Sequence, residues 1–304
     1  MDFKCIEPKD YPTLIPYFRH QPYELCEFSL ATLTVWANDE YHPQAAVDNA
    51  TLYLKGTFAK RRDLNHLMLP LSTCEDFPPE RLRDLAKELG MDSFWFIPDS
   101  YLAQYGEQRV ADLFSIEEQT AYADYVYRRE DLAQLRGNRY AKKRNLISQF
   151  LKNHSPDRLR FEEISSSNAA ICLEFLEEWC STRNCDEDLE DSLTCERLAA
   201  EKMLTNIDTI GSKGIMLKID GRICAFGISS YLTDSMGILQ FEKAFENIKG
   251  LYQFFDRECI NRLFSDYEYV NKESDMEVPG LAKSKKSYHP LKRVRSYQLK
   301  RRDL

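Results

Sequence analysis

Acidic and basic side chains crowd together in residues 270–290, which read VNKESDMEVPGLAKSKKSYHP. Three acids at positions 273, 275 and 277 are followed by three lysines at positions 283, 285 and 286. A solvated turn would account for this run of opposite charges. A site that binds an anion and removes a proton from a substrate would account for it as well. The second interpretation requires neighbouring elements that direct both kinds of group into one cleft.

The elements around this run are predicted from turn signals and from the period of the apolar residues. They are a hairpin that turns at Asp220-Gly221, a strand, a helix and a short strand, over residues 214–232, 236–244, 251–264 and 267–271. A strand–helix–strand unit of this size leaves its two strands parallel. Ligands bind beyond the carboxyl ends of such strands, where the charged run begins.

Carboxylates at the ends of these two strands are the first candidates for catalysis. Glu242 shares a predicted strand face with Gln240. Glu273 and Asp275 follow the second strand, on the face of Asn271. We expect Glu242 and Glu273 to converge, so that each raises the pKa of the other and one acts as a general base on an amine. Charges without such a role are equally common at strand ends.

A loop that could bind an anion precedes the helix at 251–264. Its sequence, ENIKG at 246–250, places backbone N–H groups at a helix start, where they attract negative charge. The helix dipole contributes only about 0.3–1 kcal/mol at an exposed end, so the charge of Lys249 would add to it. Gly250 permits close approach of a ligand to the backbone.

The first half of the chain repeats much of this order. Strands are predicted at 51–60, 66–72 and 93–98, with a helix at 78–90, and the last strand precedes its counterpart by about 173 residues. This spacing indicates a duplicated architecture. The predicted parts are an N-terminal domain, a basic connecting helix, and a C-terminal domain carrying the candidate active site, over residues 1–135, 136–155 and 156–304.

Net charge is unevenly distributed along the 304 residues, which carry −8 in total and are 43% hydrophobic. Residues 136–153 contain six basic residues and no acid, and residues 283–304 contain nine basic residues and one acid. Within the first segment, Lys143 and Arg144 crowd one side of a helix predicted over 132–154. Two basic segments on an acidic protein predict a phosphate-bearing partner, such as tRNA or an anionic lipid, although solvated surface charge is the simpler interpretation.

Several classes of protein are disfavoured by the sequence. The nine cysteines lack Cys-x-x-Cys spacing and the five histidines are scattered, so no metal site is predicted. Neither a Gly-x-Ser-x-Gly elbow nor a Gly-rich phosphate loop is present, which disfavours serine hydrolases and P-loop enzymes. No signal peptide and no apolar run of about 20 residues occurs. We therefore expect a cytoplasmic protein without a transmembrane segment or a tightly bound cofactor.

Three stretches resemble the family named after the C-terminal domain of phosphatidylglycerol lysyltransferases. They are LQFEKAFENIKGLYQFFDRECI, YEYVNKESDMEVPGLAKSKKSYHPLK and DYVYRREDLAQLRGNRYAKKRNLISQFLKNH, at 239–260, 267–292 and 124–154. The resemblance implies an α+β (mixed α/β) fold of two tandem domains similar to GCN5-related N-acetyltransferases (GNAT-like), each a mixed sheet flanked by helices. The family is also similar to peptidoglycan-bridge aminoacyltransferases, which take an amino acid from aminoacyl-tRNA.

The resemblance implies roles for particular residues. The residues that would hold a donor or acceptor phosphate are Lys249, Gly250 and Tyr252. The residues that would shape the acceptor amine or hydroxyl are Glu242, Asn271, Glu273 and Asp275. Lys285 and Tyr288 would polarise the acyl carbonyl. Further substrate contacts are expected from Lys243, Lys143 and Arg144.

Two positions depart from the family pattern, which has Gly and Arg where this chain has Glu277 and Ala282. Loss of the arginine removes a bidentate phosphate contact. The leading hypothesis is an acyltransferase that uses an aminoacyl-tRNA or acyl-CoA donor and an amine or hydroxyl acceptor. The alternatives are an acetyl-CoA dependent N-acetyltransferase of a small amine and a non-catalytic tandem module that binds RNA or a protein.

Overall fold

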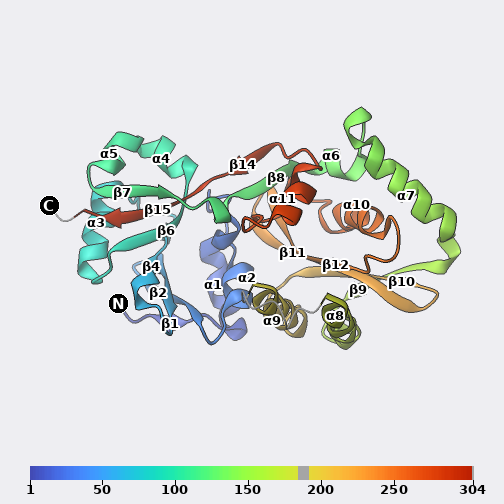
Figure 1. Ribbon diagram of the computed structural model, residues 1–304. Helices are drawn as coiled ribbons and strands as arrows, with labels where there is room; N and C mark the ends of the chain where they lie inside the picture. Colours follow the sequence, from blue (N-terminus) through green and yellow to red (C-terminus); the bar gives the residue numbers. More distant parts are fainter. Residues whose placement is uncertain (184–191, 303–304) are drawn as a thin grey trace.

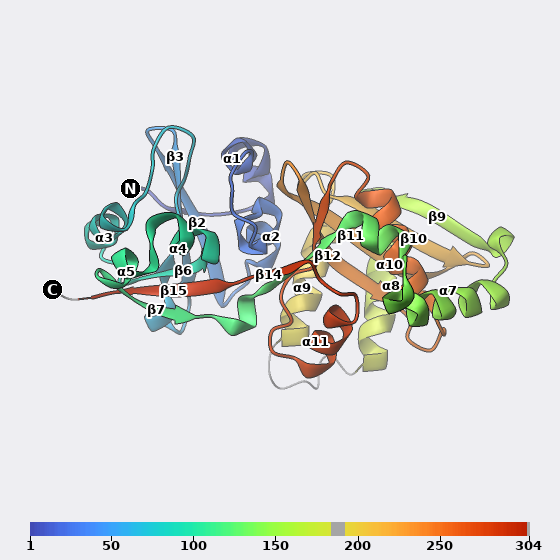
Figure 2. The ribbon, with the colours of Figure 1, turned by 90° about the horizontal axis from the view of Figure 1, so that it is seen from above.

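The computed structural model describes residues 1–183 and 192–302, which form two lobes, each built around one sheet (Figures 1 and 2). The strands of the first sheet are β1 (Lys4–Cys5), β2 (Tyr41–Asp48), β3 (Thr51–Phe58), β4 (His66–Leu67), β5 (Leu71–Ser72), β6 (Ser93–Pro98), β7 (Phe114–Glu118) and β15 (Ser296–Arg301). Those of the second are β8 (Asp124–Arg128), β9 (Leu159–Ile164), β10 (Lys213–Ile219), β11 (Arg222–Thr233), β12 (Met236–Ala244), β13 (Tyr269–Asn271) and β14 (Lys292–Val294).

Helices cover both sheets. They are α1 (Tyr11–Phe18), α2 (Leu30–Trp36), α3 (Pro79–Glu88), α4 (Asp99–Tyr105), α5 (Glu107–Ala111), α6 (Arg129–Gln134), α7 (Ala141–Asn153), α8 (Ala169–Arg183), α9 (Ser192–Thr205), α10 (Leu251–Leu263) and α11 (Pro279–Lys286). In Figure 1, α8 and α9 lie on one face of the second sheet, and α10 and α7 lie on the other. None of the described helices combines the length and the apolar character that crossing a membrane requires.

The two sheets have the same strand order. It is β1-β2-β3-β4-β6-β15-β7 in the first, where β5 also pairs with β3, and β9-β10-β11-β12-β13-β8-β14 in the second. In each sheet a parallel pair flanks a crossover helix: β4 and β6 flank α3, and β12 and β13 flank α10. The structure confirms the predicted mixed α/β class with two tandem GNAT-like units.

Each sheet contains one strand from the opposite half of the chain. β15, at the C-terminal end, lies between β6 and β7, and β8 lies between β13 and β14. The strands of each sheet therefore do not all come from one of the expected parts of the chain, at 1–135, 136–155 and 156–304. Buried side chains explain the exchange, because Tyr297 and Leu299 of β15 enter the first core while Tyr125 and Tyr127 of β8 enter the second.

The single helix expected over 132–154 is wrong, because the structure has α6 and α7 there. Leu135 and Gly137 between them adopt positive φ values of 49° and 86°, which end a helix. The Arg144 guanidinium donates to the carbonyls of both residues, at 2.5 and 2.7 Å. Arg144 therefore stabilises this turn through its Nη1 atom, which uses two of the five N–H donors of the guanidinium.

Candidate functional site

A bulge in β12 decides which way its polar side chains point. Phe241 pairs with Ile228, but the next pair joins Leu239 to Ser229, so Gln240 is an extra residue. Gln240 donates to Thr32 of α2, at 3.0 Å. The expected common face for Gln240 and Glu242 is wrong, since a bulge shifts the alternation by one residue.

Glu242 lies on the face of the second sheet that α10 covers. Its partner across the strands is Gly227, where an added Cβ would lie 2.5 Å from the sulfur of Cys259 in α10. Lys243 points to the opposite face, where its ammonium pairs with Glu196 of α9 at 2.6 Å and lies 4.4 Å from the ring centroid of Trp179 in α8.

Glu242 belongs to a group of charged and aromatic side chains that we name the β12 cluster: Lys143, Glu242, Asp256, Lys272 and Tyr288. Lys272 donates to Asp256 at 2.5 Å and lies 5.0 Å from the ring centroid of Tyr288. Burial and the negative charge of Asp256 raise the pKa of Glu242 to about 8. Its Oε1 atom is buried and has no hydrogen-bond partner among the described residues.

Lys143 and Tyr288 complete the β12 cluster from α7 and from the segment after α11. The Lys143 ammonium lies 3.7 Å from the Tyr288 ring centroid and donates to Ser287 Oγ at 2.7 Å. Burial lowers the pKa of Lys143. Burial and the charges of Asp256 and Glu242 hold the pKa of Tyr288 well above its ordinary value. The Tyr288 hydroxyl therefore stays protonated and can donate a hydrogen bond.

A second group lies between the lobes and is named the interlobe cluster: Cys26, Glu27, Asp124, Glu273 and Lys285. Asp124 has no exposed surface and accepts hydrogen bonds from the Cys26 amide and from Asn271 Nδ2, both at 2.7 Å. Asn271 also donates to the Glu24 carbonyl at 2.9 Å. Asn271 therefore positions Asp124 and fixes the N-terminal segment against β13.

Glu273 is the interlobe counterpart of Glu242. Burial and the negative charge of Asp124 raise the pKa of Glu273 to about 8, and the positive charge of Lys285 opposes this shift. Its Oε1 atom is buried without a hydrogen-bond partner in residues 1–183 and 192–302. The backbone turns there with a φ of 56°, and the Glu273 amide donates to Asn271 Oδ1 at 2.6 Å. The turn holds the carboxyl group between the lobes.

Lys285 lies inside the turn that carries Glu273. Its ammonium donates to the backbone carbonyls of Lys272, Glu273 and Ser274. Burial lowers the pKa of Lys285. Because an ammonium group has three N–H donors, a hydrogen bond to an acyl carbonyl would have to replace one of these contacts. Lys285 thus positions the Glu273 backbone.

Cys26, Glu27 and Asp124 place one potential ligand atom each within 4.8 Å of one another. Burial and the charge of Asp124 hold the pKa of the Cys26 thiol well above its ordinary value, whereas a thiol binds metal as the thiolate. Burial and Asp124 also raise the pKa of Glu27, whose Oε2 atom has no partner within the described ranges. The three side chains form a proton-rich acidic cluster.

The loop expected to bind phosphate is covered by α7. An added Cβ on Gly250 would lie 2.2 Å from the Leu146 carbonyl oxygen, and the Phe150 and Phe254 rings stack at 4.7 Å beside it. Lys249 is exposed and Tyr252 is half-buried. A phosphate could reach Gly250 only if α7 moved away.

Replacing Gly250 by alanine is expected to lower the free energy of unfolding by about 2–4 kcal/mol, because a Cβ would meet a backbone carbonyl and the φ of 83° disfavours alanine. Urea denaturation followed by circular dichroism would measure it. Gly280→Ala is the matched control, since an added Cβ there contacts nothing within 4 Å. Equal stability of both variants would contradict the packing of α7 on this loop.

Asp275 anchors the turn that carries Glu273. It accepts hydrogen bonds from the Tyr125 hydroxyl at 2.6 Å and from the Glu277 amide at 2.9 Å. Burial raises the pKa of Asp275, but the hydrogen bonds from the Tyr125 hydroxyl and the Glu277 amide outweigh it and hold this pKa below its ordinary value. Asp275 stays ionised and fixes the backbone, so its contacts are structural.

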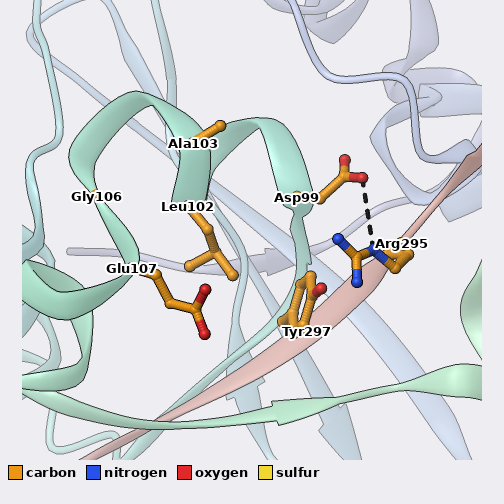
Figure 3. A pocket seen from close by; sticks show the side chains of 7 residues that line it. All are labelled: Asp99, Leu102, Ala103, Gly106, Glu107, Arg295 and Tyr297. Carbon is orange, nitrogen blue, oxygen red and sulfur yellow. Dashed lines mark ion pairs between the residues drawn. The ribbon is translucent and has the colours of Figure 1, made fainter.

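The structure thus separates the two expected carboxylates. Glu242 faces α10 and α7, and Glu273 faces Asp124 and the N-terminal segment. The surface pocket in Figure 3 lies elsewhere, between α4, the start of α5 and β15, where Arg295 and Asp99 pair at 3.9 Å. A second pocket is lined by His20, Gln21, Pro22, Glu24, Thr233, Asp234 and Ser235. Neither pocket includes a residue of the predicted site.

Sequence reasoning missed Glu27, Asp124 and Asp256. Glu27 and Asp124 belong to distant parts of the chain and meet only because β8 joins the second sheet. Asp256 lies on the apolar face predicted for the helix at 251–264, and a charged residue on such a face was the available signal.

Two similar sheets, each opened at a parallel strand pair, define a tandem α/β protein with buried carboxylates and lysines at the second opening. The family model described as "Phosphatidylglycerol lysyltransferase, C-terminal" matches residues 20–300. The chain belongs to this family. No curated protein matches it.

Solved structures agree with the fold. A conserved protein of unknown function from Bacteroides thetaiotaomicron VPI-5482 superposes with a TM-score of 0.88 at 28% identity, covering 99% of this chain and 100% of that chain. The C-terminal domain (DUF2156) of a putative lysylphosphatidylglycerol synthetase from Agrobacterium fabrum gives 0.64 at 15% identity, covering 96% and 91%. The second likeness shows a shared fold alone.

Proposed function

We propose that this chain is an acyltransferase that moves an aminoacyl or other acyl group onto an amine or hydroxyl acceptor. Its family membership supports an acyltransferase-type function. The observation that carries the proposal is the state of Glu273, a carboxyl group with a pKa of about 8 and one unpaired buried oxygen among the described residues. A general base is most effective when its pKa lies near the working pH.

The interlobe cluster suits an amine or hydroxyl acceptor. The acceptor atom attacks the acyl carbonyl and gives its proton to the ionised carboxylate of Glu273. The tetrahedral intermediate then breaks the bond to the donor, and the departing oxygen takes the proton back from Glu273. The negative charge of Asp124 raises the pKa of Glu273, so that this carboxyl group can hold the acceptor's proton until the donor departs.

An aminoacyl ester fits the structure better than acyl-CoA does. The packing of α7 on Gly250 leaves no room for a CoA phosphate at this loop without movement of α7. Exposed lysines of the two basic segments, including Lys142 on α7 and Lys286 on α11, would attract the phosphates of tRNA or of an anionic lipid. Binding through such contacts weakens as salt is added.

A non-catalytic binding module is the second candidate, because the donors of Lys285 are engaged and Glu242 and Glu273 lie in separate clusters. This arrangement leaves the acyl carbonyl without the cationic donor that the family resemblance implied.

Transfer from a panel of radiolabelled aminoacyl-tRNAs and acyl-CoA thioesters would test the proposal. The acceptors would be phosphatidylglycerol vesicles, small amines and nucleophilic alcohols. We expect enzyme-dependent transfer from an aminoacyl-tRNA. Glu273→Gln should lower its rate about 10²–10⁴-fold, and Glu117→Gln, at an exposed position of β7, should leave it unchanged. Absence of transfer from every donor would favour the binding module, transfer that Glu273→Gln leaves unchanged would contradict Glu273 as the base, and transfer from acyl-CoA alone would favour the N-acetyltransferase.

A further inference from the structure

The cavity in Figure 3 joins two distant parts of the chain in the first lobe. One wall comes from α4 and the start of α5, and the other from Arg295 and from Tyr297 of β15. The Asp99 amide donates to the Arg295 carbonyl at 3.2 Å, so a backbone hydrogen bond holds the two walls together. The cavity measures about 370 Å³, within the range of about 300–1,000 Å³ that is usual for ligand pockets. It therefore has the size and the fixed frame of a site for a small molecule.

Two polar groups of this cavity lack a partner in the chain as described. Tyr297 is only 9% exposed, and its ring extends into the cavity in Figure 3. Its hydroxyl makes no hydrogen bond with any of residues 1–183 and 192–302. The Glu107 carboxylate forms neither an ion pair nor a hydrogen bond within the same two ranges. A nearly buried hydroxyl without a partner is costly, and a bound ligand can supply the missing hydrogen bond.

Negative charge prevails in the cavity. It contains the carboxylates of Asp99 and Glu107 and a single cation, Arg295, which pairs with Asp99 at 3.9 Å. Because Asp99 neutralises Arg295, the charge of Glu107 is the one left for a ligand. Figure 3 shows Glu107 at the end of the cavity away from this ion pair. This arrangement attracts a cation to Glu107 and disfavours an anion.

An apolar wall lies between the two charged ends. Leu102 is 7% exposed, and its side chain extends toward Tyr297 in Figure 3. The exposed Ala103 of α4 also lines the cavity. An aliphatic chain can pack on these groups, and an aromatic face attracts a cation that lies within about 6 Å of its centroid. Both properties match a ligand that combines a positive charge with a hydrocarbon portion.

We infer that this cavity binds a small primary alkylamine, with the ammonium group on the Glu107 carboxylate and the alkyl chain against Leu102 and Tyr297. The cavity shares no residue with the β12 cluster or the interlobe cluster. An amine bound there would lie in the first lobe, whereas Glu273 lies between the lobes. The inference therefore goes beyond the proposed transfer reaction and does not rest on it.

Methyl NMR of the full chain, labelled with carbon-13 at the alanine methyl groups, tests the inference. Ala103→Ser removes one resonance and thereby assigns the methyl group in the cavity wall. We expect pentylamine to shift this resonance until the site is saturated. Pentanol and pentanoate carry a chain of the same length without positive charge, and should bind more weakly by about tenfold or more.

Variants of the cavity distinguish its groups by the same titration. Glu107→Gln should weaken pentylamine binding by about tenfold or more, because a hydrogen bond to a charged group is lost. Tyr297→Phe keeps the ring and removes the hydroxyl, so it should weaken binding by about threefold. Glu88→Gln is the matched control, because it removes an exposed carboxylate from α3 of the same lobe. Binding to this control should equal that of the wild type.

Four results would overturn the inference. The first is an Ala103 resonance that pentylamine does not shift, and the second is pentylamine binding that Glu107→Gln leaves unchanged. Equal binding of pentylamine and pentanol would show an apolar cavity that does not select charge. Tighter binding of pentanoate would assign the cavity to anions held by Arg295. Alanine methyl resonances outside the cavity that match those of the wild type establish that each variant is folded.

Discussion

Glu273→Gln is expected to lower the rate of acyl transfer by about 10²–10⁴-fold, the usual contribution of a general base. The wild-type rate should rise with pH and level off above the Glu273 pKa of about 8, because only the ionised carboxylate accepts a proton from the acceptor. The variant should lose this dependence. Single-turnover transfer from aminoacyl-tRNA between pH 6 and 9 would measure both effects.

Glu273→Gln lowers activity but is expected to increase the free energy of unfolding. The Glu273 pKa is raised from its ordinary value of 4.5 to about 8, so stability from the protonated carboxyl is fully present below about pH 4.5 and is lost as pH rises to 8. Glutamine cannot ionise. At pH 8 the free energy of unfolding of Glu273→Gln should therefore exceed that of the wild type by about 1–3 kcal/mol, measured by urea denaturation. A less stable variant would mean that Glu273 is an ordinary ionised partner of Lys285.

Lys285→Met is expected to lower the free energy of unfolding by about 3–5 kcal/mol. The substitution leaves the carbonyls of residues 272 and 274 without their Lys285 donor, while the Glu273 carbonyl still accepts from the Tyr125 amide, and each unsatisfied buried carbonyl costs about 1–3 kcal/mol. Thermal unfolding followed by circular dichroism should show a midpoint about 10 °C lower. Transfer activity should fall as well, since the turn positions Glu273.

Two exposed neighbours provide the control for Lys285. Lys283→Met and Lys286→Met remove the same charge from the same helix without freeing a buried carbonyl, so each should change stability by no more than about 0.5 kcal/mol. Similar melting curves for all three variants would show that Lys285 is a surface charge, and would remove the physical basis for the Glu273 turn.

Much of the second sheet could be predicted from the sequence because its signals are local. The Asp220-Gly221 turn fixed the hairpin of β10 and β11, and the apolar period located α10 to within one residue at its end. The bulge at Gln240 gave no such signal. It depends on pairing with β11, and it reversed the expected relation of Gln240 and Glu242.

The interlobe cluster could not be predicted because it depends on strand exchange. Residues 296–301 have the composition of a basic tail, and only Tyr297 and Leu299 indicate a buried strand face. In the first sheet β15 occupies the place between β6 and β7. β8 pairs instead with β13 in the second sheet, and this pairing brings Asp124 beside Glu273. No short stretch of sequence contains that contact. Glu273 was found because it follows a strand, whereas Glu27 was missed.

Carbon-13 NMR titration of carboxyl groups in protein labelled at glutamate Cδ tests the central claim most directly. Glu242→Gln and Glu273→Gln would each remove one resonance and thereby assign it. Two resonances that titrate near pH 8, far from those of surface glutamates, are the expected result. Titration of both below about pH 5 would leave neither carboxyl able to hold a proton at neutral pH, and would contradict the assignment of Glu273 as the base.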